Sequence, residues 1–552
     1  MKNATEIGLA GLTVVALAAL TTTSARADAV TDWNLKAGEL VVESKMGTPP
    51  ANRVMAIVQT AVLGAVQAAP ANEPAAIASA VAAANRATLA KLLPAQQAAI
   101  DAAYQAALAA VPEGKAKTAG IAAGEHAAAT VLAARAADLA PAPDRYRPHA
   151  SAGAYVPTAA VAATQWPQRQ PWLLASAAQF RPGPPPALDS ERWARDYEEI
   201  RALGGRSSTR RSAEQTEIAR FWEYSMPPIY YAVVRSVALA PGRDELRNAR
   251  LFATVAQAMD DALIAVFDAK YHYNFWRPVT AIRNGDADGN PATQPEPGWQ
   301  PMIDTPMHPE YPSAHSILAA TVATVLQADV GSGAPMPELA SSSPTAKGAT
   351  RRWSRLGDFV QEVSDARVYE GVHFRYATEV GSAMGRQVGA LAALSLKQQQ
   401  QTGAPRAGGE PQPAKLLDQV SARGVQIYEC RAAPAAQGGG AGWVFVAPEA
   451  ELFDAQGRPS GRHYAGPHWE AADGSRIVGQ ALARADAPQD DAIPWLLLSA
   501  RSAGGAGRYA AVTRVQRVNT SGGVAPSGGC DGGSVGVTAR VPYEADYLMF
   551  GA

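Results

Sequence analysis

Three short segments of the chain combine cations and imidazoles at spacings that could place them around one anion. The first segment carries Lys270 and Arg277, which are seven residues apart and followed by Pro278. Seven residues are about two helical turns, so both side chains could leave one face of a helix that ends near Pro278. A guanidinium offers a planar fork to an oxyanion, and an ammonium offers a point charge. Taken alone, two cations on one face are typical of a solvated helix.

The second segment, residues 308–315, reads HPEYPSAH and precedes an apolar run. Ser313 is a residue type that caps helix N-termini. The first turn of a helix presents free N–H groups and the positive end of a dipole, which favours an anion. His315 lies in that first turn and can exchange a proton near neutral pH. By itself, the pattern also fits a capped helix with an incidental histidine.

The third segment adds another guanidinium and another imidazole, Arg367 and His373. Gly371 between them permits a tight backbone turn. A neutral imidazole nitrogen can attack phosphorus or coordinate vanadium.

In order and internal spacing, the three segments resemble the signature of the vanadium-dependent haloperoxidase and type 2 phosphatidic acid phosphatase superfamily. That signature is Lys, six residues, Arg-Pro; then Pro-Ser-Gly-His; then Ser-Arg, three residues, Gly, one residue, His, three residues, Asp. The sequences of residues 271–278 and 308–313 are similar to those of the soluble bacterial haloperoxidase-like branch. The resemblance covers residues 28–396 and implies a helical bundle with a site for vanadate or phosphate.

The resemblance assigns the anion-binding groups by position. Lys270, Arg277 and Arg367 would neutralise the oxyanion. Ser313 and the backbone N–H of Ala314 would donate hydrogen bonds to it.

The resemblance also assigns the imidazoles. His373 would be the axial ligand to vanadium or the nucleophile on phosphorus, and His315 would be the general acid and base. His308 would border the halide site. Phe275 and Tyr311 are aromatic candidates for the pocket wall.

Three departures from the signature bear on activity. Ala314 replaces the usual Gly, and residues 365–366 (Asp-Ala) replace the small residue and the Ser that precede Arg in the signature. Ala377 stands where the signature has Asp, a carboxylate that can fix the tautomer of an imidazole. Glu370 and Glu379 are candidate substitutes for that carboxylate.

The resemblance therefore implies an enzyme that oxidises halide with hydrogen peroxide at a histidine-bound vanadate, with Lys270 polarising the bound peroxide. A secreted acid phosphatase acting on phosphate esters through a phosphohistidine is the alternative on the same site. A protein that binds oxyanions without turnover is a third interpretation, motivated by Ala377.

Helices must position these residues. Apolar residues recur at helical spacing over 251–270, 316–328 and 378–396, and an alanine-rich pattern predicts further helices in residues 28–140. We therefore predict a mainly α-helical domain over residues 28–396.

The residue pattern changes after a polar, Pro- and Gly-rich linker at 397–413. Short β-branched and aromatic runs such as 424–428 (GVQIY), separated by Gly-rich turns, predict a small all-β domain over 414–552. Residues 424–428 and 466–469 (GPHW) resemble a family of secreted domains with no assigned function.

The N-terminus predicts export. Residues 1–27 contain a basic start, an apolar run over 7–20 and small residues before Asp28, as in a signal peptide, so we expect a periplasmic or extracellular protein. Oxidising surroundings and an even cysteine count then predict one disulfide between Cys430 and Cys530.

Composition bounds the remaining possibilities. A chain of 552 residues with 47% hydrophobic and 18% charged residues can fold as more than one globular unit. A formal net charge of −1 gives no reason to expect nucleic acid as a partner. The absence of a later long apolar stretch argues against stable membrane insertion.

Overall fold

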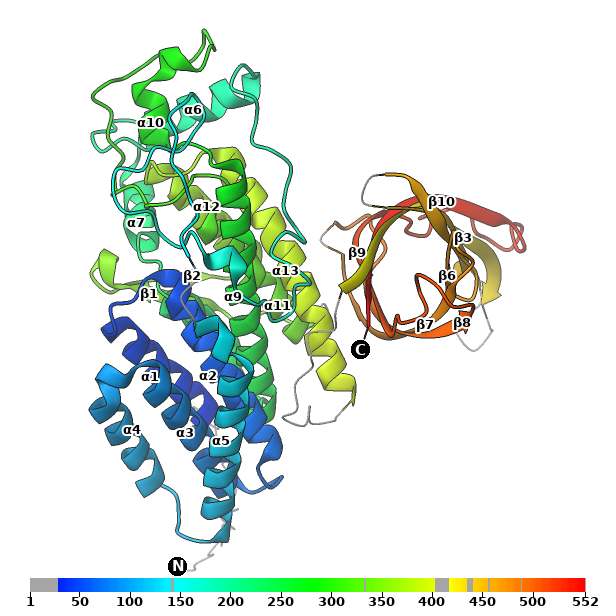
Figure 1. Cartoon of the computed structure of the whole chain (residues 1–552), viewed down its shortest axis with the longest axis horizontal. Coiled ribbons are helices and arrows are strands. Elements are labelled where there is room, and N and C mark those ends of the chain that lie inside the picture. Colours follow the sequence, from blue (N-terminus) through cyan, green and yellow to red (C-terminus); the bar gives the residue numbers. More distant parts are fainter. Residues whose placement is uncertain are drawn as a thin grey trace, which may run out of the picture.

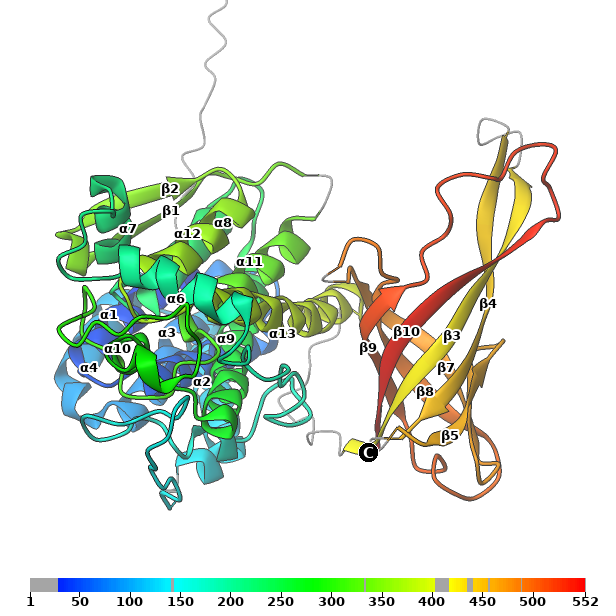
Figure 2. The same ribbon diagram turned by 90° about the horizontal axis from the view of Figure 1, so that it is seen from above.

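The computed structural model describes residues 28–139, 143–331, 334–402, 416–433, 440–454, 457–487 and 489–551. They form a helical domain followed by an antiparallel β-barrel (Figures 1 and 2). The predicted fold class, a mainly α domain followed by an all-β domain, is confirmed. The predicted signal peptide lies outside the described residues.

The helical domain is built from α-helices and one short hairpin. The helices are α1 (Ala29–Glu43), α2 (Thr48–Ala68), α3 (Pro74–Leu92), α4 (Gln97–Ala109), α5 (Lys115–Ala134), α6 (Glu191–Leu203), α7 (Ala213–Trp222), α8 (Pro228–Ala238), α9 (Glu245–Tyr273), α10 (Pro278–Arg283), α11 (Ala314–Val330), α12 (Leu356–Tyr369) and α13 (Arg375–Thr402). The hairpin pairs β1 (Leu339–Ser343) with β2 (Ala349–Trp353). Within the described residues, no helix is both long and apolar enough to cross a membrane.

Helices α9, α11 and α13 pack against one another and form the centre of the domain (Figure 1). Helix α9 is buried along most of its length, because apolar residues occupy more than one of its faces. It begins after Asp244, whose side chain accepts the N–H of Arg247, and it ends at Asn274 in the left-handed conformation. This end places Lys270 in the last turn and Arg277 just beyond the helix.

Three glycines, four residues apart, allow α13 to approach α11 closely. A Cβ on Gly381 would lie 2.6 Å from the carbonyl oxygen of Ser313, and one on Gly385 would lie 2.4 Å from that of Ile317. A Cβ on Gly389 would lie 2.5 Å from Cβ of Thr324. The absence of side chains on this face of α13 therefore fixes the distance between the two helices.

Buried aspartates of α9 hold the irregular connection that precedes α6. Asp261 accepts hydrogen bonds from the backbone N–H groups of Trp172, Leu173 and Leu174, and Asp260 accepts one from the Trp172 indole. These bonds compensate for the burial of carboxylates that are both 0% exposed.

The C-terminal domain is a closed barrel in the order β10-β3-β4-β5-β6-β7-β8-β9. Its strands are β3 (Leu416–Ala433), β4 (Gly440–Phe453), β5 (Pro459–Tyr464), β6 (His468–Ala471), β7 (Arg476–Ala485), β8 (Trp495–Gly504), β9 (Arg514–Gly522) and β10 (Thr538–Phe550). Closure pairs every strand on both edges, which removes the exposed edges of an open sheet. A disulfide joins Cys430 to Cys530.

The boundary between the domains differs from the sequence-based expectation in one respect. Helix α13 continues to Thr402, six residues into the segment expected to be a linker, and it contacts β7 and β8 of the barrel. The run of glutamines after Lys397 is helical because Gln is a good helix former.

We expect Gly381→Ala to destabilise the helical domain by about 1–3 kcal/mol, because its methyl group would overlap the Ser313 carbonyl. Thermal or denaturant unfolding measures this change. Gly357→Ala on α12 is the control, because a Cβ there meets nothing within 4 Å. Equal stabilities of the two variants would contradict the assigned role of the glycine face.

Candidate oxyanion site

The three sequence segments converge where α9, α11 and α12 present their ends. Lys270 lies in the last turn of α9, Arg277 caps α10, and Ser313 caps α11. Arg367 lies in the last turn of α12, and His373 lies between α12 and α13. These five residues are between 0% and 2% exposed.

Arg277 connects its own segment to the other two through hydrogen bonds. Its Nε donates to the carbonyl oxygen of His308 at 2.8 Å, and one terminal nitrogen donates to that of Val372 at 2.8 Å. The same terminal nitrogen lies 3.3 Å from Nε2 of His373, and the other lies 2.9 Å from Nδ1 of His308. The guanidinium is therefore held rigidly beside both imidazoles.

Lys270 is fixed by two backbone carbonyls. Its Nζ donates to the carbonyl oxygens of Pro309 at 2.9 Å and Glu310 at 2.8 Å. An ammonium has three donors, so one remains for another acceptor. Burial first, and then the neighbouring Arg277, hold the pKa of Lys270 well below its ordinary value. A bound anion would favour the charged form.

His373 is oriented by Glu310, a residue of the second segment to which we had assigned no role. Oε1 of Glu310 lies 2.9 Å from Nδ1 of His373 and accepts the N–H of Phe374 at 3.0 Å. Because Oε1 already acts as an acceptor for Phe374, we assign the proton of this pair to Nδ1. The lone pair of Nε2 then accepts an N–H of Arg277, and an electrophile that binds this nitrogen would replace that hydrogen bond.

Glu310 supplies the carboxylate that the signature has at position 377. Ala377 is buried, and its carbonyl oxygen accepts the N–H of Ser313. Neither substitute considered from the sequence serves His373, since Glu370 forms an ion pair with Arg367, and Glu379 lies at the surface bonded to Arg192. The position of Glu310 three residues before Ser313 was the available signal, but only folding brings it to His373.

Burial raises the pKa of Glu310 to about 8, and Lys270 and Arg277 oppose this rise. The pKa of His373 is held well below its ordinary value by burial and then by Arg277, Lys270 and Arg367. The imidazole is therefore neutral at neutral pH, as a nucleophile or metal ligand must be.

Ser313 can act toward a further group only as a donor. Its hydroxyl oxygen accepts the N–H of Ser316 at 3.4 Å and the Ser316 hydroxyl at 3.1 Å. A hydroxyl has two lone pairs and one proton, so both acceptor positions are filled. The remaining proton is available to an oxyanion. Ala314 follows as the first residue of α11, where the helix leaves its N–H without an intrahelical partner.

Arg367 and His315 complete the charged surroundings. Arg367 pairs with Glu370 and donates to the carbonyl oxygen of Trp222 at 3.4 Å, while its buried Nε has no hydrogen-bond partner in the structure. His315 is partly buried, and its Nε2 also has none. Burial, Arg367, Lys270 and Arg277 hold the pKa of His315 well below its ordinary value.

The donor set fits a tetrahedral oxyanion. Three buried cations face two carboxylates, Glu310 and Glu370, whose pKa values are both raised to about 8 by burial. When these carboxylates are protonated, the positive charges of Arg277 and Arg367 are left uncompensated, and an anion would neutralise them. Among the described residues there is no group of three or more His, Cys, Asp or Glu side chains that could hold a metal ion.

Aromatic residues near the site form its packed support. Trp193 of α6 stacks on Trp276 with ring centroids 5.9 Å apart and meets Phe275 edge-on at 5.8 Å. Tyr311 is 2% exposed and lies in the same cluster. His308 is partly buried, with its ring edge-on to Phe267 at 5.2 Å.

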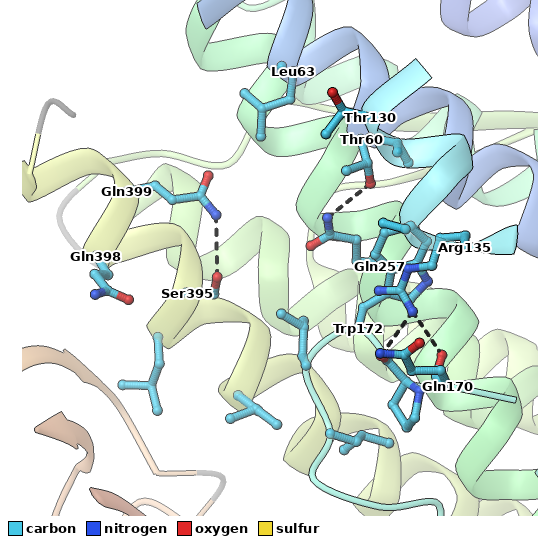
Figure 3. Close-up of a pocket in the computed structure, with 18 of the residues that line it drawn as sticks. Thr60, Leu63, Thr130, Arg135, Gln170, Trp172, Gln257, Ser395, Gln398 and Gln399 are labelled. Carbon is cyan, nitrogen blue, oxygen red and sulfur yellow. Dashed lines mark hydrogen bonds between the residues drawn. The ribbon is translucent and has the colours of Figure 1, made fainter. Parts of the chain in front are cut away.

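A separate cavity of about 320 Å³ lies between the helical domain and the barrel (Figure 3). Gln257 of α9 donates to Thr60 on its wall, and Arg135 lies over the ring of Trp172 at 3.6 Å. Gln257 is 13 residues from Lys270, which is about 20 Å along a helix. None of the residues that the sequence motifs indicated lines this cavity.

The helical domain therefore buries a carboxylate-oriented histidine among three basic side chains, an arrangement suited to an oxyanion. Residues 250–402 match the family model of the VCPO second helical-bundle domain. Residues 411–551 match a family described as a protein of unknown function (DUF3455). With the relatives below, these matches support the superfamily that the motifs indicate for the helical domain.

Individual proteins are similar to this chain in sequence or in fold. The chain is 33% identical over 150 residues to the vanadium chloroperoxidase of Curvularia inaequalis, which covers 22% of this chain and 24% of that protein. The fold is similar to that of a bacterial vanadium-dependent iodoperoxidase, with a TM-score of 0.55 and 23% identity over 66% of this chain and 95% of that chain. A holo-type bacterial vanadium-dependent chloroperoxidase gives a TM-score of 0.52 and 17% identity over 68% and 94% of the two chains.

The affinity for an oxyanion should fall as pH rises through about 8, because Glu310 then ionises beside the site. Tungstate is a suitable probe, since its charge stays constant over this range. We expect its dissociation constant, measured by calorimetry, to rise about tenfold between pH 7 and 9, or about 1.4 kcal/mol. Glu310→Gln removes the titrating group and should flatten this dependence, leaving the contribution of Lys270. The same pH slope in both proteins would exclude Glu310 as its source.

Ala377→Asp should bring no gain in oxyanion affinity or turnover, because Glu310 already occupies Nδ1 of His373. A second buried carboxylate costs free energy, so we expect lower stability. Ala377→Asn is the uncharged control in the same unfolding and calorimetric measurements. Tighter binding in Ala377→Asp alone would show that Glu310 does not meet this need.

Proposed function

We propose that the helical domain is a vanadate-dependent haloperoxidase that oxidises halide with hydrogen peroxide. The observation that carries the proposal is the orientation of His373, whose Nδ1 is held by Glu310 while Nε2 faces Arg277 among three buried cations. Bound vanadate would supply the Lewis acid that makes peroxide electrophilic toward halide. The similarity to vanadium haloperoxidases supports this assignment.

Each residue of the site has a defined task in this proposal. Nε2 of His373 would hold vanadium, and Lys270, Arg277 and Arg367 would neutralise the oxygens around it. Ser313 would donate its free proton to one of these oxygens. The unbonded donor of Lys270 would polarise the bound peroxide.

His315 would move the proton. The same cations that hold its pKa down in the free site are neutralised when an oxyanion binds, so the pKa of His315 should rise toward its ordinary value. A histidine that titrates near the working pH is suited to general acid and base catalysis. His308, partly buried beside Arg277, would border the halide.

The alternative is a phosphatase on the same residues. The Glu310 oxygen at Nδ1 fixes the tautomer in which Nε2 carries the lone pair, and this contact favours attack on phosphorus as well as coordination of vanadium. His373 would then form a phosphohistidine with a phosphate ester. The third interpretation, a protein without turnover, was motivated by the missing carboxylate at position 377. Because Glu310 takes that place beside His373, this motive no longer applies.

Equilibrium dialysis with orthovanadate, followed by elemental analysis, tests the proposal directly. His373→Ala should lower vanadate affinity about hundredfold or more, because it removes the nitrogen that would hold vanadium. His272→Ala is the matched control, because that histidine is exposed near the end of α9. Thermal unfolding of both variants separates loss of the ligand from loss of the fold.

Two activity assays then separate the candidate reactions. Halide-dependent consumption of peroxide by the vanadate-loaded protein supports the haloperoxidase. Release of phosphate from a simple ester without peroxide supports the phosphatase. Failure to retain vanadate, together with inactivity in both assays, would overturn both functions.

A further inference from the structure

A chain of buried serine hydroxyls leads from the oxyanion site to a second cavity. Ser316 of α11 donates to Ser313 at 3.1 Å, and Ser364 of α12 donates to Ser316 at 3.2 Å. Ser382 of α13 lies 3.2 Å from Ser364. These four side chains come from three helices and are between 0% and 7% exposed.

The direction of the chain follows from counting protons. A serine hydroxyl has a single proton, and that of Ser364 is given to Ser316. The contact between Ser364 and Ser382 must therefore run from Ser382 to Ser364. All bonds then point toward Ser313, whose own proton is free for the oxyanion. Hydrogen bonds aligned in this way polarise one another.

The end of the hydroxyl chain that is remote from Ser313 reaches a cavity of about 790 Å³, which Ser364 and Ser382 both line. Its wall includes Thr378 from α13, and its rim includes exposed groups such as Glu379. The barrel contributes Asp486 from the connection that follows β7. Solvent can therefore reach the end of the chain that is remote from the oxyanion.

We propose that Ser382, Ser364 and Ser316 form a proton relay that supplies Ser313, and through it the bound oxyanion, from this cavity. The inference rests on the proposed function. Halide oxidation consumes one proton, since hydrogen peroxide, halide and a proton give hypohalous acid and water. The side chains that would hold the oxyanion are at most 2% exposed, so a path through buried hydroxyls would connect it to solvent; they are Lys270, Arg277, Ser313, Arg367 and His373.

The transfer balances without an oxidant or a reductant. Ser313 gives its proton to an oxygen of the oxyanion and takes the proton of Ser316. Ser316 takes that of Ser364, Ser364 takes that of Ser382, and Ser382 takes one from solvent acid in the cavity. Each O–H bond that breaks is replaced by one that forms, and rotation of the hydroxyls then restores the original direction.

Close approach of α11 and α13 makes the relay possible. Gly381 precedes Ser382, and a Cβ on this glycine would lie 2.6 Å from the Ser313 carbonyl oxygen and 3.2 Å from Cβ of Ser316. The close packing at this glycine therefore brings Ser382 near enough to Ser313 for two hydroxyls to connect them.

The test replaces Ser364 by Thr and by Val, which have the same shape but differ in the hydroxyl. The vanadate-loaded protein is assayed at saturating peroxide and halide, or with a phosphate ester if that is the active substrate. We expect Ser364→Val to lower kcat about tenfold relative to Ser364→Thr, since a positioned proton donor contributes at least that much. Ser382→Thr and Ser382→Val repeat the comparison where substitution at 364 prevents folding.

A second readout separates proton transfer from packing. Turnover in mixtures of H₂O and D₂O should depend on deuterium content with curvature in the Thr variants, because several protons move, and linearly in the Val variants. Ser395→Thr and Ser395→Val on α13 are the controls, because Ser395 lines the other cavity, and we expect them to be equal.

The outcomes distinguish failure of the relay from failure of the proposed function. Equal turnover and equal isotope dependence of the Thr and Val variants in an active protein would overturn the relay alone. A wild-type protein inactive toward both substrates would overturn the proposed function and the relay with it.

Discussion

The burial of Lys270, Arg277 and Arg367 around His373 is the constraint on which the rest of the helical domain depends. Cations that are at most 2% exposed cannot be solvated by bulk water, so the protein must supply acceptors. Backbone carbonyls of Pro309 and Glu310 serve Lys270, and Glu370 serves Arg367. The loops that carry these acceptors are thereby fixed, and their geometry follows from the charges that they compensate.

Carboxylates of raised pKa let this cluster remain folded without losing its affinity for an anion. Fully ionised, Glu310 and Glu370 would cancel most of the positive charge. Because burial raises both pKa values to about 8, the two groups can take up protons near neutral pH. The excess of positive charge that remains is what an oxyanion would neutralise. Stability and ligand binding are therefore linked through the same protons.

The sequence predicted the helices and the residues of the three segments because both depend on local spacing. Ser313 follows from its capping position, which a short-range rule describes. The expectation that Lys270 and Arg277 share one helical face was wrong, because α9 ends at Tyr273 and Arg277 lies beyond it at the start of α10. The role of Glu310 was missed because its contact with His373 joins residues 63 positions apart. The hydroxyl chain was missed for the same reason, since Ser316, Ser364 and Ser382 lie on three different helices. Contacts of this kind follow from packing, which a single sequence does not specify.

Helix α13 connects these contacts to the barrel. His373 lies two residues before it begins, Gly381 sets its distance from α11, and Ser382 continues the hydroxyl chain. The same helix contacts β7 and β8. A shift of this helix along its axis would move the serine and the glycine face together, because both belong to one rigid element. The barrel, which also lines the cavity at the end of the hydroxyl chain, is therefore placed to hold α13 in register with the oxyanion site.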